Sequence, residues 1–152
     1  MPAIKEKKKS SEEFFLGEIY KTVKMGAESI INLLPSVKDD SMRSIMTLQL
    51  DGYEKYAARA ATALEERCCE AREENLFTRV SAKMGMAINT MIDSTASHIA
   101  EMMIEGSNMG ITDMTKLLNC HEPRGSGKEA TRLAREIVAF EEHNLELLKR
   151  YL

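Results

Sequence analysis

Two histidines in this sequence each lie three residues before a glutamate, a spacing that places both side chains on one face of a helix. The pairs are His98 with Glu101 and His143 with Glu146. Helical bundles that do redox chemistry at paired metal ions use the reverse order, Glu-x-x-His, on two helices. That order is missing from the chain. A complete two-metal centre is therefore not expected, and no motif for a nucleophilic enzyme stands out, so an enzyme is the less favoured class.

A few polar residues fall on the apolar faces of predicted helices. These are Gln49, Glu105, Glu141 and Asn144, with His98 at the margin. Buried carboxylates are costly unless they have partners. In one interpretation His98, Glu105 and Glu141 hold an iron, manganese or zinc ion. In the other they bond to amide, Lys or Arg side chains or to water and fix the helix register. We favour the second and expect no metal, no other cofactor and no catalytic residue.

Methionine is abundant, with eleven residues, whereas aromatic residues make up only 5% of the chain. Thioethers suit Cu(I), and methionine-rich surfaces adapt to many ligands. Met42 and Met46 are one helical turn apart, and Met102 and Met109 share a later stripe. Core packing explains these positions without a ligand, because Met can fill a core that has few aromatic residues.

Two glycines four residues apart, Gly106 and Gly110, interrupt a predicted helix. Each costs about 1 kcal/mol relative to Ala in a helix. The pair therefore predicts the close approach of another helix or a local bend. Cys68 falls on the apolar seam of an earlier helix, which predicts a buried thiol.

Apolar residues recur at steps of three and four along most of the chain, as is typical of amphipathic helices. This spacing predicts long helices over residues 11–34, 36–73, 95–120 and 126–152, with a short or kinked extra helix over 80–92. Pro35 ends the first helix, and Ser94 or Thr95 caps the helix that follows the extra one. The fold class is all-α, an antiparallel four-helix bundle.

Composition excludes further classes of partner and location. The 21 basic and 24 acidic residues give a net charge of −3, which argues against a nucleic-acid partner. The three cysteines suggest a reducing, cytoplasmic setting, and no apolar run is long enough to span a membrane. We expect residues 1–10 to form a flexible basic tail and residues 11–152 to form a single domain.

The stretch 84–119, MGMAINTMIDSTASHIAEMMIEGSNMGITDMTKLLN, together with the closing FEEHNLELLKRYL, resembles a family of small bacterial ferritin-like helical-bundle proteins. The resemblance implies a cytosolic bundle but no activity that can be assigned to named residues. Where ferritin-like enzymes have Glu-x-x-His, this chain has Glu141-x-x-Asn144.

Three functions follow from these observations as alternatives. The leading one is a non-enzymatic interaction or scaffold protein whose main partner is itself, as a homodimer or larger oligomer. The second is a metal-binding ferritin-like protein with oxygen or peroxide chemistry. The third is a binder of apolar small molecules that uses the methionine stripe.

Overall fold

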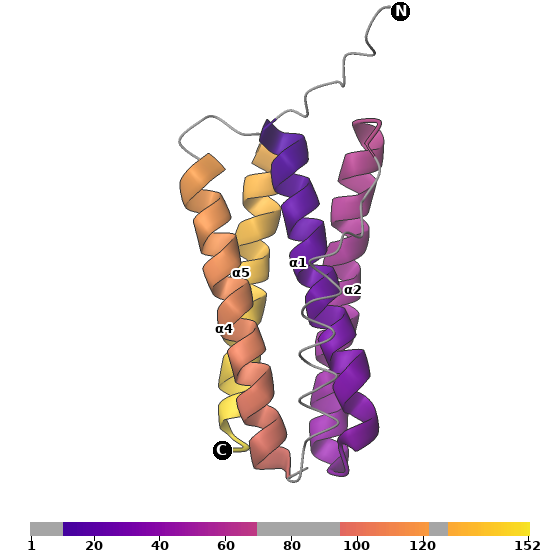
Figure 1. Ribbon diagram of the computed structural model, residues 1–152, viewed down its shortest axis with the longest axis vertical. Helices are drawn as coiled ribbons and strands as arrows, with labels where there is room; N and C mark the ends of the chain where they lie inside the picture. Colours follow the sequence, from indigo (N-terminus) through magenta and orange to yellow (C-terminus); the bar gives the residue numbers. More distant parts are fainter. Residues whose placement is uncertain (1–10, 70–94, 122–127) are drawn as a thin grey trace, which may run out of the picture.

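The structure, a computed structural model, describes residues 11–69, 95–121 and 128–152. Four long helices form a bundle in these ranges (Figure 1): α1 (Ser11–Leu33), α2 (Asp40–Glu66), α4 (Ala96–His121) and α5 (Lys128–Lys149). A short 3-10 helix, η1 (Leu34–Ser36), follows α1, and the described ranges contain no strand. The predicted all-α four-helix bundle is confirmed. The basic tail over 1–10 and the extra helix over 80–92 lie outside the described residues.

The helices are arranged as two antiparallel pairs. Helix α1 packs along α2 and α4 packs along α5, while α1 also contacts α4 and α2 contacts α5. Neighbouring helices run in opposite directions, whereas α2 and α4 run in the same direction, so α2 ends and α4 begins at opposite ends of the bundle (Figure 1). Within the described ranges, no helix combines the length and apolar character needed to cross a membrane.

The core is a continuous set of apolar side chains from all four helices. It includes the largest fully buried residues, Phe15, Leu16, Ile19, Leu33, Met42, Met46, Ile99, Met114, Ile137 and Leu148. They recur at the spacing read from the sequence, which is why one face of each helix is apolar. Methionine does act as core filler at Met42, Met46 and Met114, which are fully buried.

Helix α2 is shorter than predicted, because local hydrogen bonds define both of its ends. Asp39 caps its start: the Asp39 Oδ1 accepts a hydrogen bond from the Met42 backbone N–H at 2.8 Å. At the other end the Cys69 N–H donates to the Leu64 carbonyl and the Cys68 N–H to the Glu65 carbonyl, both at 2.9 Å. This is the Schellman pattern of a helix C-terminus.

Cys68 occupies the left-handed position of this motif, with a φ of 56°. Its side chain is exposed, so the predicted buried thiol is wrong. The helix stops at Glu66, two residues before Cys68, and the chain direction changes before the apolar seam reaches that position.

The start of α4 agrees with the predicted cap, since the Thr95 Oγ1 accepts a hydrogen bond from the His98 N–H at 3.2 Å. Four helix ends meet at the opposite end of the bundle. There Arg67 bridges Glu12 of α1 at 3.2 Å and Glu129 of α5 at 3.1 Å, and Ser11 Oγ lies 3.0 Å from His121 Nδ1. These contacts join the start of α1 to the ends of its neighbours.

Candidate functional site

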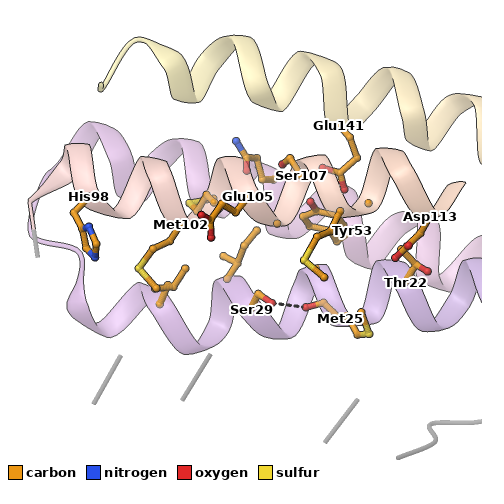
Figure 2. Close-up of a pocket in the computed structure, with 18 residues that line it drawn as sticks. Thr22, Met25, Ser29, Tyr53, His98, Met102, Glu105, Ser107, Asp113 and Glu141 are labelled. Atoms are coloured by element: carbon orange, nitrogen blue, oxygen red, sulfur yellow. Dashed lines mark hydrogen bonds between the residues drawn. The ribbon is translucent and has the colours of Figure 1, made fainter. Parts of the chain in front are cut away.

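A cavity of about 460 Å³ opens between α1 and α4 (Figure 2). Much of its wall is apolar, formed by Met25, Ile30, Leu33, Met102, Met103 and Met109. Polar side chains reach it from the other two helices: Gln49 and Tyr53 from α2, and Glu141 from α5. All four helices therefore contribute to one site.

Two glycines allow Tyr53 and Glu141 to reach this space. A Cβ added at Gly26 of α1 would lie 2.5 Å from Tyr53 Cε1, so the Tyr53 ring fills the place of a side chain. A Cβ added at Gly110 of α4 would lie 3.1 Å from the Glu141 Oε1. The close approach predicted at Gly110 is confirmed. At Gly106 no helix approaches closely, because an added Cβ there would meet nothing within 4 Å, and the alternative of a local bend stays a prediction.

A buried polar cluster lies at the inner side of the cavity. Gln49, Glu141 and Asn144 are each at most 3% exposed, which confirms their predicted inward positions, and Ser107 is equally buried. Three of their atoms have no hydrogen-bond partner within residues 11–69, 95–121 and 128–152: Gln49 Nε2, Glu141 Oε2 and Asn144 Nδ2. Buried polar atoms normally have partners. The cluster is therefore able to accept a further polar group.

The carboxyl group of Glu141 is electrostatically unusual. Burial raises its pKa from 4.5 to about 7, and the nearby polar groups of Tyr53, Ser107 and Asn144 offset part of this rise. Burial also raises the pKa of the Tyr53 hydroxyl, and the negative charge of Glu141 raises it further. Tyr53 thus stays protonated at neutral pH, while Glu141 is about half ionised there.

The other two proposed metal ligands line other parts of the same cavity. Glu105 is exposed, so its predicted inward position is wrong; it faces the rim of the cavity rather than the core. His98 is half-buried, as its marginal position predicted, and its Nδ1 lies 3.6 Å from the Glu101 Oε2. Figure 2 shows His98 at one end of the cavity, well separated from Glu141. The structure therefore does not bring His98, Glu105 and Glu141 together.

The donor set also does not fit a ferritin-like two-metal centre. Such a centre takes a Glu from two helices and Glu-x-x-His from the other two. In the described helices Glu141 is the one buried carboxylate, and Asn144 stands where that motif has His. No group of three or more His, Cys, Asp and Glu side chains in residues 11–69, 95–121 and 128–152 could hold a metal ion.

The lining of the cavity is acidic. Glu105, Asp113 and Glu141 belong to it, whereas none of its described residues is Lys or Arg. Burial raises the pKa of the Asp113 carboxyl; nearby Lys116 lowers it and Glu18 raises it. The cavity thus combines an apolar wall with negative charge.

Sequence reasoning missed several of these residues. Tyr53 follows the apolar spacing of α2, which indicates a core position and no polar role, and Asp113 and Ser107 carry no signal of their own. On α1 a recognisable pattern does exist. Small or flexible residues recur about every three residues beside the apolar stripe, at Thr22, Met25, Gly26 and Ser29. Small or flexible residues at such a helix edge can leave space for a ligand.

Comparison of the chain with models of known protein families and with curated proteins gives no match. The resemblance of residues 84–119 and 140–152 to ferritin-like bundle proteins therefore stays a prediction. Inference about function rests on the cavity and its buried carboxylate.

Proposed function

We propose that this protein binds a small, largely apolar molecule in the cavity between α1 and α4. The observation that supports this proposal is a cavity of about 460 Å³ with an apolar wall and a few converging polar groups. Ligand sites in proteins are typically about 300–1,000 Å³ and have this composition. The third function considered from the sequence is thus the one that the geometry favours.

The position of the methionines adds to this proposal. Met102 and Met109 were expected to fill the core. Met102 is half-buried and packs against the core, whereas Met109 is 52% exposed, so the expectation is wrong for Met109. Both line the cavity, as do Met25 and Met103. Unbranched thioether side chains adapt their shape to a ligand, which suits a binding wall. A scaffold role and self-association remain predictions that this cavity does not require.

Metal-dependent oxygen or peroxide chemistry receives less support. Its ligand set would need carboxylates and histidines from several helices. The core instead offers Glu141 with amide and hydroxyl groups, and His98 lies apart from it.

Titration with Nile red, an uncharged apolar dye, tests the proposal. We expect a rise in dye fluorescence with the native protein, together with shifted methyl NMR signals of Met25, Met102, Met103 and Met109. The signals of Met42 and Met46, which are buried in the core and do not line the cavity, should move less. No binding to the folded protein, or shifts spread evenly over all the methionines, would contradict it.

A cavity-filling variant gives a second test. Ser29 lines the cavity from α1, so Ser29→Phe should reduce Nile red binding at least tenfold. Ser44 is exposed on α2 and does not line the cavity, which makes Ser44→Phe the matched control. Circular dichroism of both variants checks that the bundle is intact. Equal binding by the two variants would place the dye outside the cavity.

A further inference from the structure

We infer that the ligand of this cavity is an organic cation, an amine with an apolar chain whose ammonium group pairs with the Glu141 carboxylate. The inference rests on the proposed function and specifies the chemical class of its ligand. It combines the charge of the lining, the state of Glu141 and the shape of the apolar wall.

The first observation is the sign of the charge around the cavity. Three carboxylates line it, those of Glu105, Asp113 and Glu141, and its described lining includes no Lys or Arg. Walls of low polarity focus such a field, so a cation is attracted and an anion is repelled. A fatty acid or another anionic amphiphile is therefore disfavoured.

The second observation is that Glu141 has no basic partner among the residues that the structure describes. Glu141 is 3% exposed, and within the same residues its Oε2 forms no hydrogen bond. A buried carboxylate in this state is unfavourable, and a cationic donor relieves it by a short charge-assisted hydrogen bond. Because Gly110 has no side chain, Glu141 extends from α5 past α4 toward Tyr53 and the cavity (Figure 2).

The third observation is that the apolar wall of the cavity extends away from Glu141 along α1 and α4. From Tyr53 and Glu141, Figure 2 shows the cavity continuing between α1 and α4 past Met102 toward His98. Met103, Ile30 and Leu33 also line it. An ammonium group at Glu141 would thus leave an attached apolar chain in contact with flexible and branched apolar side chains.

Isothermal titration calorimetry with decylamine, decanol and decanoate tests this assignment. All three are used below their micelle concentrations, at pH 8 and 150 mM salt. Under these conditions an alkylamine is protonated, since an amine such as that of Lys has a pKa of about 10.4. Glu141 is mostly ionised, because its pKa is about 7. We expect decylamine to bind at least tenfold more tightly than decanol, and decanoate to bind most weakly.

Glu141→Gln is the decisive variant and Glu142→Gln its matched control, because Glu142 is the next residue of α5 and is exposed. Glu141→Gln should lose most of the preference for decylamine over decanol, because only the carboxylates of Glu105 and Asp113 then remain in the described lining. Glu142→Gln should keep the full preference for the amine. Glu141→Met, which replaces the carboxylate by an apolar side chain of similar length, provides the same comparison if Glu141→Gln does not fold.

The outcomes separate the two proposals. If decanol binds wild type as tightly as decylamine, the cavity binds apolar molecules but the assignment of a cationic ligand is wrong. If the amine preference of Glu141→Gln is as large as that of wild type, the pairing with Glu141 is wrong. If none of the three compounds binds and Nile red does not bind either, the proposed function itself fails.

Discussion

Ionisation of Glu141 should make the bundle less stable as the pH rises. The pKa of its carboxyl group is about 7 in the folded protein and 4.5 in the absence of burial. Between these values the folded state holds a proton that the unfolded state has lost, so the free energy of unfolding falls with increasing pH. Below about pH 4.5 the effect is absent, and above about pH 7 it is complete.

The size of the effect follows from the same two values. One pKa unit corresponds to about 1.4 kcal/mol. A change from 4.5 to about 7 therefore amounts to about 3 kcal/mol of lost stability at high pH. This is a large share of the about 5–15 kcal/mol that stabilises a typical domain.

Urea unfolding followed by far-UV circular dichroism at pH 5, 6, 7 and 8 measures this effect. The quantity of interest is the difference in unfolding free energy between Glu141→Gln and wild type, because other titrating groups cancel in it. We expect this difference in unfolding free energy to shift in favour of the variant by about 2.5 kcal/mol between pH 5 and pH 8, because part of the full effect lies below pH 5. Tyr53 does not contribute, since its pKa lies well above 10.

A difference that is independent of pH from 5 to 8 would refute this reasoning, because it would mean that Glu141 titrates alike in the folded and unfolded states. Glu142→Gln is the control on the same helix. Its side chain is exposed and lies outside the buried polar cluster.

The remaining predictions concern single side chains and are measured by urea unfolding at constant pH. Gly26→Ala should destabilise the protein by about 1–3 kcal/mol, because the added Cβ would lie 2.5 Å from the Tyr53 ring. Gly106→Ala should instead stabilise it by about 0.5–1 kcal/mol, because the added Cβ meets nothing within 4 Å. Equal effects of the two substitutions would contradict the packing at Tyr53. Asp39→Ala should lower the free energy of unfolding by about 1 kcal/mol, because the cap of α2 is lost, while Asp39→Asn should keep most of the stability that the cap provides. Cys68→Gly should increase the free energy of unfolding by about 1 kcal/mol, because glycine adopts a φ of 56° without strain. A decrease would show that contacts of the Cys68 side chain stabilise the protein more than its backbone strain destabilises it.

Local patterns in the sequence were enough to predict the helices and much of their orientation. Apolar spacing and Pro35 predicted α1 as 11–34 against the observed Ser11–Leu33, and Thr95 was one of the two residues predicted to cap α4. The inward positions of Gln49, Glu141 and Asn144 also came from spacing alone. Such predictions succeed because a helix repeats every 3.6 residues, so neighbouring residues determine which side chains share a face.

The cavity could not be predicted in the same way. Its walls come from α1 and α4, with Tyr53 from α2 and Glu141 from α5, and its opening depends on Gly26 and Gly110 lying opposite those two side chains. No local pattern shows which glycine faces which side chain. That correspondence depends on how the four helices are rotated and shifted along one another.

The sequence by itself determined the helical class, the apolar faces and the presence of Glu141 among them. Only the tertiary structure decided that Glu105 and Met109 point away from the core, that Cys68 lies beyond the end of α2, and that Glu141 meets Tyr53 beside a cavity. The physical reason is that periodicity orders residues around one helix axis, whereas burial depends on which neighbouring helix covers each part of that circumference.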